Sequence, residues 1–521
     1  MIVAFRCDAT QGQSDMSQVF QRVGVIGAGA MGRGIAQMVV QAGCQVSIYD
    51  SAPAACEAAR QGILAQWSRM SSKGKCSADQ EQAWGQNLSI AASINDMAGC
   101  DLIIEAIVER LDVKREVFAQ VEQCVSADCV LATNTSSLSV TAIAATLKHP
   151  ERVAGYHFFN PVPLMRLVEV IPGLKTNSQV CERLTQLTKD MGHTPVSAQD
   201  TPGFIVNHAG RGYGTEALRI ISESVSDFAT VDRILRDQAG FRLGPFELMD
   251  LTALDVSHPV MESVYHQYFE EPRYRPSVIT AQRLAGGLLG KKVGEGFYNY
   301  ADGVVQTPPE ADAPTPAMMP PVWVSPKAAR RPELYQLLKD LGADIETGQA
   351  PSERALILVA PLGMDVTTLA AVERLDPTRV LGIDLLIPDA ATRRRVLATN
   401  PATRADMRDA AHALFARDGK AVSVIKDSGG FVTQRVLATI VNIASDICQQ
   451  SICTPQDLDL AVSLGLGYPK GPLAWGDELG PTNILETLFN LQTVYGDPRY
   501  RPSPWLRRRG ALGLSLKHQE I

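Results

Sequence analysis

A histidine and a glutamate, His157 and Glu169, stand in the stretch 152–171, which reads RVAGYHFFNPVPLMRLVEVI. The period-two alternation of side chains predicts two short strands joined by a proline-containing turn, with one of these two residues on each strand. Glu169 shares a face of its strand with Leu167 and Ile171, so its carboxylate lies among apolar neighbours and needs a partner. A histidine held by a buried carboxylate can act as a general base, although the same two residues could also form a purely structural ion pair.

A glycine-rich loop near the start of the chain predicts a nucleotide site. The apolar strand VGVIG runs into GAGAMG at 27–32, and a helical segment and a second strand ending in Asp50 follow. A GxGxxG between a strand and a helix, with an acidic residue about 20 positions later, is the fingerprint of dinucleotide-binding folds. We expect Asp50 to bind the ribose hydroxyls and to repel a 2′-phosphate, which favours NAD over NADP.

The residues of this loop have separate predicted parts. Gly27 permits the tight turn, Gly29 lets the backbone approach the pyrophosphate, and Gly32 lets the helix pack closely on the strand. Ala30 and Met31 lie between the second and third glycines, and the N-terminus of the helix that follows supplies amides and a partial positive charge for the anion. The alternative is a glycine-rich turn with a structural role only.

Polar residues follow two further predicted strands, within 100–108 and at 129–133. Ligands of open α/β sheets bind beyond the carboxyl ends of the strands, so Glu109 is a candidate contact on the nicotinamide side. The second strand ends in Asn134-Thr135-Ser136-Ser137, where Asn134 or Ser136 could face a ligand, while Ser137 or Ser139 could cap the next helix. Three lysines are candidates for contacts with ligand phosphates, although such lysines more often lie in solvent: Lys73, Lys75 and Lys114.

The composition argues against several classes of protein. A net charge of −7 without a basic run argues against nucleic-acid binding, and the apolar runs are too short to span a membrane. The ten cysteines are scattered without a CxxC or a Cys/His cluster, which predicts reduced thiols in a cytoplasmic protein and no metal site. The first twenty residues lack the apolar core of a signal peptide and predict a disordered tail, with Met16 as a possible start.

The second half of the chain repeats the first. HPERVAGYHFFNP (149–161) is matched by DPTRVLGIDLLIP (376–388), and TPGFIVN (201–207) by SGGFVTQ (428–434), at a constant offset (434 − 207 = 227). At this offset Ser136, His157, Glu169 and Asn207 correspond to Gly363, Asp384, Val396 and Gln434. The apolar framework is kept while these polar residues change, and the glycine loop has no counterpart. This difference favours a functional role for the four residues of the first copy.

Several motifs together resemble the 3-hydroxyacyl-CoA dehydrogenases, and the whole chain is similar to the long bacterial forms linked to phenylacetate breakdown. The motifs are the GxGxxG at 27–32, NTSS at 134–137, HFFNP at 157–161, LVEV at 167–170, PGFIVN at 202–207 and GPFEL at 244–248. The resemblance implies an α/β Rossmann-type NAD-binding domain plus an all-α domain, followed by a degenerate second copy. The predicted parts are a tail (1–20), the NAD-binding domain (21–200), a helical substrate and dimerisation domain (201–300), a linker (301–326), a degenerate α/β segment (327–426) and a second helical domain (427–521).

The resemblance also implies roles for the four residues. His157 would take the 3-hydroxyl proton of an L-3-hydroxyacyl-CoA while C3 gives hydride to NAD, and Glu169 would orient it and stabilise the imidazolium. Ser136 and Asn207 would hydrogen-bond the reacting oxygen or the thioester carbonyl. The second copy would bind no NAD and would imitate, within one chain, the contact between the helical domains of a homodimer.

The chain departs from the family after Asn207, where it reads HAGRGYG (208–214). Each glycine in a helix costs about 0.5–1 kcal/mol relative to alanine, so the helix predicted over 204–226 should loosen, kink or pack closely here. One hypothesis is that the glycines make room for the acyl tail and that Arg211 or His208 meets a distal carboxylate, such as that of 3-hydroxyadipyl-CoA. The alternative is that both are surface residues.

Two other functions stay open at this point. One is a dehydrogenase of a small hydroxy or sugar acid, which the unusual segment after Asn207 permits. The other is a crystallin-like protein that binds NAD(H) without turnover, against which the intact set of four polar residues argues.

Overall fold

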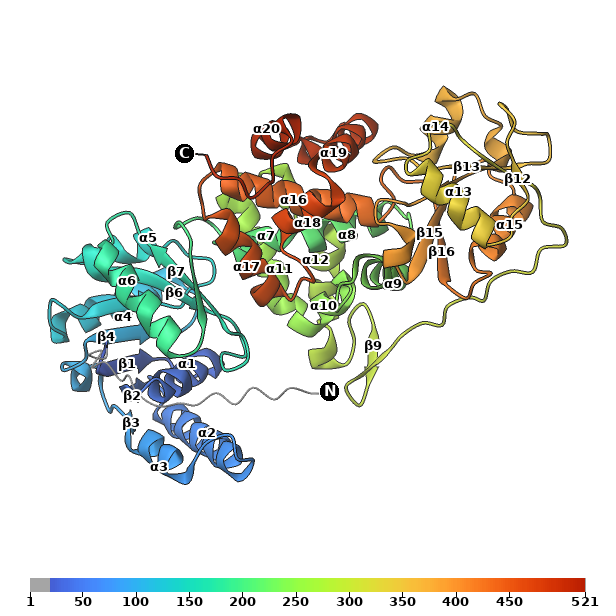
Figure 1. The fold of residues 1–521 in the computed structure, drawn as a ribbon. Helices are drawn as coiled ribbons and strands as arrows, with labels where there is room; N and C mark the ends of the chain where they lie inside the picture. Colours follow the sequence, from blue (N-terminus) through green and yellow to red (C-terminus); the bar gives the residue numbers. More distant parts are fainter. Residues whose placement is uncertain (1–18, 521) are drawn as a thin grey trace, which may run out of the picture. The chain divides into compact units, whose positions relative to one another are not determined.

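The computed structural model describes residues 19–520, which fall into two compact units, Met1–Val196 and Ser197–Ile521 (Figure 1). Most of the predicted tail lies outside the described residues. Phe20, which we assigned to that tail, is fully buried, and the guanidinium of Arg183 lies 4.2 Å from the centre of its ring. The folded part of the first unit therefore begins before residue 21.

The first unit is built on an eight-stranded sheet in the order β3-β2-β1-β4-β5-β6-β7-β8. The pairs from β3 to β6 are parallel, and β6 pairs with β7 in the antiparallel direction. The strands are β1 (Arg22–Ile26), β2 (Gln45–Tyr49), β3 (Leu88–Ile90), β4 (Leu102–Glu105), β5 (Val130–Thr133), β6 (Val153–Phe158), β7 (Leu167–Pro172) and β8 (Thr194–Ser197). This order is that of a Rossmann-type nucleotide-binding fold, as predicted.

Helices cover both faces of this sheet. They are α1 (Ala30–Gln41), α2 (Pro53–Ser72), α3 (Ala78–Gln86), α4 (Leu111–Cys124), α5 (Val140–Ala144) and α6 (Ser178–Asp190). Apolar residues of α1, α2 and α6 share one buried cluster with the sheet, and on the opposite face Val140 of α5 lies against Gly155. Because helices cover both faces, the central strands are apolar throughout, which is typical of a parallel sheet.

The second unit contains a smaller sheet in the order β12-β11-β13-β14-β15-β16, in which only the β14–β15 pair is antiparallel. Its strands are β11 (Val322–Val324), β12 (Ile345–Glu346), β13 (Leu356–Val359), β14 (Val380–Ile383), β15 (Arg394–Thr399) and β16 (Ala421–Ile425). The strands β11, β13, β14, β15 and β16 follow one another as β4 to β8 do in the first sheet. The second copy therefore keeps the half of the sheet that carries the β6–β7 pair and lacks the glycine-loop half.

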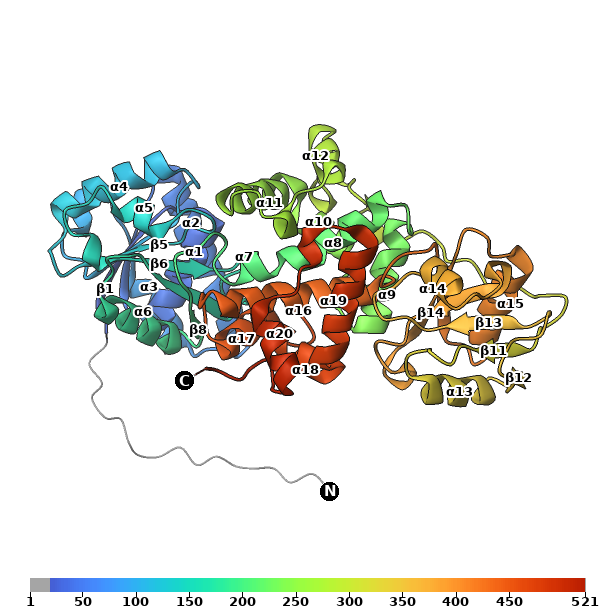
Figure 2. The same cartoon turned by 90° about the horizontal axis from the view of Figure 1, so that it is seen from above.

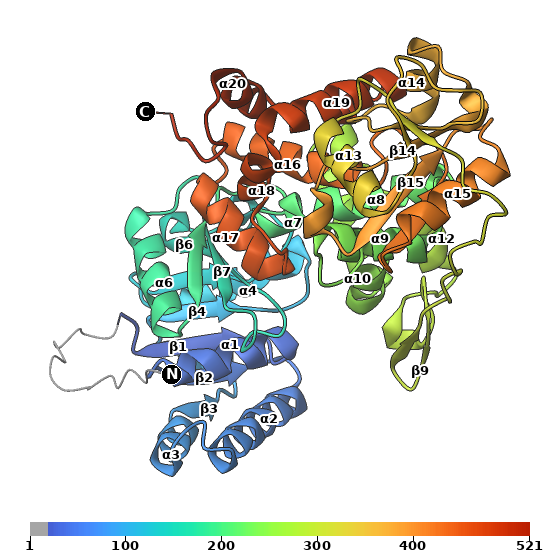
Figure 3. The ribbon, with the colours of Figure 1, turned by 45° about the vertical axis from the view of Figure 1, so that its right-hand side comes forward.

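The predicted linker 301–326 is not free of secondary structure, and its boundary was wrong. Strands β9 (Asn299–Ala301) and β10 (Val304–Gln306) form a hairpin that projects from the second unit (Figure 3). Val322 and Val324 of β11 are buried in the core of the second sheet, together with residues of α13 (Arg331–Asp340) and α15 (Ala405–Phe415). A three-residue strand between prolines gives too short an alternation to be recognised from sequence.

The helices of the second unit come from both copies. The first copy supplies α7 (Val206–Ala209), α8 (Arg211–Ser222), α9 (Phe228–Ala239), α10 (Pro245–Thr252), α11 (Leu254–Gln267) and α12 (Val278–Ala285). The second supplies α14 (Val366–Val372), α16 (Thr433–Gln449), α17 (Pro455–Leu466), α18 (Pro472–Leu479), α19 (Pro481–Tyr495) and α20 (Pro504–Leu512). The long helix α16 lies along α8, so the two copies pack directly on each other (Figure 2).

The helix predicted from Phe204 begins later and is divided. Gly203 and Phe204 have positive φ values of 77° and 47°, so the chain makes a turn before α7 starts. Gly210 separates α7 from α8, and a Cβ on Gly212 would lie 3.3 Å from the Cα of Ile440 on α16. Of the three effects expected from the glycines, close packing is the one that the structure shows most directly, because α16 approaches the backbone of α8.

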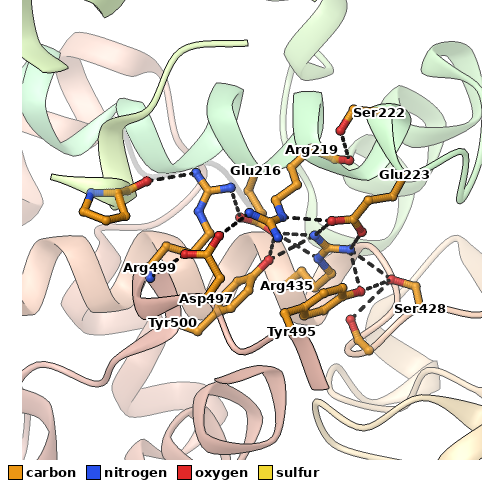
Figure 4. Close-up of polar contacts among 12 residues, drawn as sticks. Glu216, Arg219, Ser222, Glu223, Ser428, Arg435, Tyr495, Asp497, Arg499 and Tyr500 are labelled. Atoms are coloured by element: carbon orange, nitrogen blue, oxygen red, sulfur yellow. Dashed lines mark hydrogen bonds and ion pairs between the residues drawn. The ribbon is translucent and has the colours of Figure 1, made fainter. Parts of the chain in front are cut away.

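A buried network of charges joins the two helical copies (Figure 4). Arg435 of α16 is fully buried and lies 2.8 Å from Glu216 of α8, which is also fully buried. The hydroxyl of Tyr500 donates a hydrogen bond of 2.7 Å to Glu216 and accepts one of 3.0 Å from Arg435. The repeat places Arg273 of the first copy opposite Arg499 of the second: Arg273 pairs with Asp446 on α16, and Arg499 lies 3.6 Å from Glu216 on α8. Each copy therefore contacts the long helix of the other, as the two partners do in an isologous interface.

Candidate functional site

His157 and Glu169 are direct partners across the β6–β7 pair. The antiparallel register places one opposite the other, and Nδ1 of His157 lies 2.6 Å from Oε2 of Glu169. Glu169 has no exposed surface and His157 is 4% exposed. A carboxylate only accepts hydrogen bonds, so this contact places the imidazole proton on Nδ1 and makes Nε2 the basic nitrogen. The predicted partnership is confirmed, and the arrangement is that of an oriented histidine base.

The loop that carries Ser136 is held by Glu109. Oε1 of Glu109 accepts hydrogen bonds from the Oγ1 of Thr135 at 2.7 Å and from the backbone amides of Ser136 at 2.7 Å and Ser137 at 3.0 Å. Burial would raise the pKa of Glu109, but nearby Lys114 and these hydrogen bonds lower it overall. Glu109 is therefore an anion that shapes the serine loop at the end of β5.

Lys114 forms an ion pair with the carboxylate of Glu109. Its side chain is 1% exposed, and its Nζ lies 2.6 Å from Glu105 and 3.4 Å from Glu109. Glu105 also accepts a hydrogen bond from Thr133 at 2.7 Å. The sequence made Lys114 a candidate for contacts with ligand phosphates. In the structure its ammonium group instead forms ion pairs with two protein carboxylates. The sequence signal was Glu105 itself, a charge inside an apolar strand, which needs a partner.

Asn134 connects the ends of two neighbouring strands. Its Oδ1 accepts a hydrogen bond of 2.8 Å from the amide of Phe158, the residue after His157. Ser139, one of the two predicted caps, accepts a hydrogen bond of 3.1 Å from the amide of Ala142 at the start of α5. The polar loop after β5 is thus tied to β6 beside the histidine.

The glycine loop has the geometry that a dinucleotide needs. Gly27 has a φ of 105°, and a Cβ there would collide with the backbone of Ala106; a Cβ on Gly32 would collide with Gly27. Around Gly29, by contrast, no atom of the described chain lies within 4 Å of the Cβ position. The first and third glycines therefore serve the turn and the helix packing, while the second leaves open space at the N-terminus of α1.

Asp50 stands at the end of β2 beside this loop. Its carboxylate accepts hydrogen bonds of 2.8 Å from the amide of Ala28 and 2.9 Å from the amide of Ala52. The aspartate therefore fixes the loop in addition to its predicted role toward the ribose. Lys73 and Lys75 lie exposed in the loop between α2 and α3.

Asn207 lies on α7 in the second unit, so the four predicted catalytic residues are divided between the units. The residue lines a cavity of about 270 Å³ within the second unit, together with Arg211, Gly214, Leu466 and Tyr468. The expectation that His208 and Arg211 are surface residues is wrong. His208 is fully buried and its ring nitrogens contact Tyr274 at 2.6 Å and Tyr268 at 3.0 Å, while Arg211 is partly buried in the cavity wall.

His208 carries no charge that could bind an anion. Burial, with smaller effects from Arg211 and Arg273, lowers its pKa to about 3. The hypothesis that His208 meets a substrate carboxylate is therefore not supported, and Arg211 is left as the candidate.

In the second copy, the residues at the equivalent positions bind one another. Gln434 accepts a hydrogen bond of 2.8 Å from the amide of Gly363 and donates one of 2.9 Å to Asp384. These three correspond to Asn207, Ser136 and His157 of the first copy. The side chain of Gln434 thus fills the space between the positions that would have to receive a substrate, and the second copy is closed at this point.

Comparisons with known proteins agree with this fold and this arrangement. The model of the 3-hydroxyacyl-CoA dehydrogenase NAD-binding domain matches residues 22–201, and that of the C-terminal domain of the same family matches twice, at 203–300 and 430–519. A Rossmann-type unit that presents a histidine–carboxylate pair beside a dinucleotide loop defines an NAD-dependent dehydrogenase. The chain belongs to the 3-hydroxyacyl-CoA dehydrogenase family and oxidises 3-hydroxyacyl-CoA with NAD.

Individual relatives cover either the whole chain or its first half. The 3-hydroxyadipyl-CoA dehydrogenase of Escherichia coli K12 is 39% identical over 94% of this chain and 98% of its own length. The crystal structure of 3-hydroxybutyryl-CoA dehydrogenase from Escherichia coli K12 is 38% identical, with a TM-score of 0.82 over 95% of this chain and 98% of that one. A probable 3-hydroxybutyryl-CoA dehydrogenase of Deinococcus radiodurans is 38% identical but covers 54% of this chain with all of its own length. Relatives with a single copy therefore exist beside the duplicated form.

Residues 19–520 lack two kinds of feature. Among these residues no helix has the length and apolar character to cross a membrane. Nor do they contain a group of three or more His, Cys, Asp or Glu side chains placed to hold a metal ion.

Proposed function

We propose that His157 is the general base of the dehydrogenase reaction and that Glu169 orients it. The supporting observation is the 2.6 Å contact between two buried side chains, which directs Nε2 away from the carboxylate. Nε2 takes the proton of the 3-hydroxyl as the hydride leaves C3, and the Glu169 carboxylate stabilises the imidazolium that forms. NAD supplies the hydride acceptor. General-base assistance of this kind contributes roughly 10²–10⁴-fold in rate.

The remaining residues hold the substrate and the cofactor. Ser136, on the loop anchored by Glu109, and Asn207, at the cavity of the second unit, hydrogen-bond the reacting oxygen and the thioester carbonyl. The backbone amides of the glycine loop hydrogen-bond the pyrophosphate, and the carboxylate of Asp50 accepts hydrogen bonds from the ribose hydroxyls. The loop residues are Gly27, Gly29, Ala30, Met31 and Gly32. Asn134 and Glu109 border the nicotinamide side, with Lys114 acting through Glu109.

The acyl group is of one of the two kinds named for the relatives, a short simple chain or a chain that ends in a carboxylate. The nine described cysteines are all thiols, which supports a cytoplasmic location. The reciprocal contacts of Arg273 with Asp446 and of Arg499 with Glu216 support the idea that the second helical copy imitates a dimer contact within one chain, so that any homodimer would use another surface. Cleavage between 307 and 320 should leave the two halves associated on a sizing column.

The test measures NADH oxidation with acetoacetyl-CoA and 3-oxoadipyl-CoA, using wild type and His157→Gln. We expect His157→Gln to lose at least about 100-fold in kcat while binding NADH as the wild type does. His149→Gln is the matched control, because His149 lies in the same unit with half of its side chain exposed. If the wild type bound NADH without turning over either substrate, the small hydroxy acids would be tried next and the catalytic proposal abandoned.

A further inference from the structure

The cavity of the second unit has a wall that is mostly apolar but contains two unusual polar groups. Its apolar lining comes from helices of both copies, including Leu248, Met249, Met261 and Leu466. Arg211 and Tyr468 lie in the same wall, the first from α8 and the second from the segment between α17 and α18. An apolar cavity with a cation and a hydroxyl in its wall suits a ligand that is apolar along its length and anionic at one end.

Arg211 has a charge without a protein counterion. Its Nε donates a hydrogen bond of 2.8 Å to the backbone oxygen of Asn207, and no described residue places a carboxylate within ion-pair distance of its guanidinium. Elsewhere in this unit the buried arginines are paired, as Arg435 is with Glu216. Burial lowers the pKa of Arg211 to about 10, which leaves it protonated at neutral pH. A partly buried cation of this kind is costly unless an anion accompanies it.

Tyr468 supplies a second group without a partner. The side chain is 5% exposed, and its hydroxyl is buried without a hydrogen-bond partner among residues 19–520. Arg211 and Tyr468 line the same cavity. Buried hydroxyls are nearly always hydrogen-bonded, and an exception requires an explanation. An oxygen of a bound anion would satisfy both groups at once.

The position of Arg211 relative to Asn207 sets the length of the ligand. The guanidinium folds back on the turn that carries Asn207, four residues earlier. This contact holds the guanidinium close to Asn207, so a carboxylate a few carbons beyond a C3 atom near Asn207, as in an acyl chain of about six carbons, could reach it. A simple four-carbon acyl group would end before it reached Arg211.

We propose that Arg211 and Tyr468 form a carboxylate site that selects acyl-CoA substrates ending in a carboxylate, of the 3-hydroxyadipyl class. The guanidinium offers the planar pair of N–H donors that fits a carboxylate, and the phenol adds a third donor. The proposal rests on the proposed function, since it assumes that Asn207 faces the reacting part of the acyl chain. It also gives the second copy a part in the reaction, because that copy supplies Tyr468.

The test compares 3-oxoadipyl-CoA with 3-oxohexanoyl-CoA, which has the same number of carbons and no carboxylate. We expect the wild type to have the higher kcat/KM for 3-oxoadipyl-CoA. Arg211→Gln should lower that value by roughly 10- to 100-fold, mainly through KM, and Tyr468→Phe by roughly 3- to 10-fold, while 3-oxohexanoyl-CoA changes less than about 3-fold with either. Arg211→Lys should recover part of the loss because it restores the charge.

Two controls separate the possible outcomes. Arg242→Gln removes an exposed positive charge of the same unit and should leave both substrates unchanged. Tyr468→Phe removes one oxygen atom and keeps the ring that packs on Phe241 at 5.1 Å, so it tests the site without a packing defect. If the ratio between the two substrates stayed the same in both Arg211→Gln and Tyr468→Phe, the carboxylate site would be refuted while the dehydrogenase proposal stood. Absence of turnover of both substrates by the wild type would instead refute the proposed function.

Discussion

Replacing Arg435 by methionine should destabilise the second unit strongly, because it leaves a buried carboxylate without its nearest counterion. Glu216 has no exposed surface, and its contacts are Arg435 at 2.8 Å, Arg499 at 3.6 Å and the hydroxyl of Tyr500 at 2.7 Å. Breaking a buried pair on one side costs roughly 3–5 kcal/mol. With an unfolding entropy of about 2.1 cal/mol/K per residue and 325 residues (197–521), this lowers Tm by about 4–7 °C.

The effect should depend on pH in a defined direction. Burial alone would raise the pKa of Glu216, but Arg435 and Arg499 lower it below 4.5 in the folded wild type. This carboxylate therefore adds stability above about pH 4.5 that is lost as the pH falls through its folded pKa. In Arg435→Met the effect of burial on Glu216 dominates. The ionised carboxylate of Glu216 is then destabilised, and protonation of this carboxylate relieves the destabilisation. The difference in Tm between variant and wild type should be larger at pH 7.5 than at pH 4.5.

Scanning calorimetry at both pH values tests this reasoning, and the transition of the first unit serves as an internal reference. Arg508→Met is the control, since Arg508 is exposed on α20, and a surface substitution of this kind changes stability by about 0.5 kcal/mol or less. Adding Glu216→Gln to Arg435→Met should recover part of the lost Tm. An equal loss at both pH values, or a double variant no more stable than the single one, would refute the argument that an unpaired charge is the cause.

Three further predictions concern the first unit and the closed second copy. Gly29→Ala and Gly32→Ala should both weaken NADH binding in a fluorescence titration, but only Gly32→Ala should also lower Tm, because its Cβ meets protein backbone whereas that of Gly29 meets open space. Glu109→Gln should loosen the serine loop and lower kcat by roughly 10-fold, since it weakens four charge-assisted hydrogen bonds; an unchanged kcat would show that the loop does not need this anion. Gln434→Ala should cost about 1–3 kcal/mol in unfolding free energy and leave kcat unchanged, because it removes only bonds within the second copy, to Gly363, to Asp384 and to the backbone oxygen of Pro361.

Local patterns accounted for the parts of the chain that depend on short-range geometry. The alternation in 152–171 was sufficient to pair His157 with Glu169, because neighbouring antiparallel strands bring residues opposite each other in a fixed register. The glycine loop was predictable because a GxGxxG between a strand and a helix is a local signature, and the contact that requires Gly32 lies within the loop itself, at Gly27. The start of α7 was missed because Gly203 and Phe204 adopt positive φ, which a helical pattern does not reveal for phenylalanine.

Features that depend on distant segments were not predictable. Neither Arg211 nor Tyr468 is unusual by itself, and their meeting in one cavity follows from the docking of the second helical copy on the first. A sequence signal did exist for Tyr468, because the repeat places it opposite Phe241, and a hydroxyl added to a buried ring needs a partner. The comparison of the two copies draws attention to His157, because the second copy has an aspartate at that position. The same comparison would draw attention to Tyr468, because the first copy has a phenylalanine there.

The second copy has lost the means to catalyse and has used the same positions for structure. Where the first copy has Asn207, the second has Gln434, which donates a hydrogen bond to Asp384. Where the first copy has the neutral His208 between two tyrosines, the second has Arg435, which forms an ion pair with Glu216 of the first copy. The amide oxygen and the amide nitrogen of Gln434 both bond to this framework, so the side chain is not available to a substrate. The duplicate therefore contributes by covering α8 and, through Tyr468, by lining the cavity in which Asn207 stands. On this argument a chain cut back to the first copy would lose discrimination between acyl chains before it lost the hydride transfer itself.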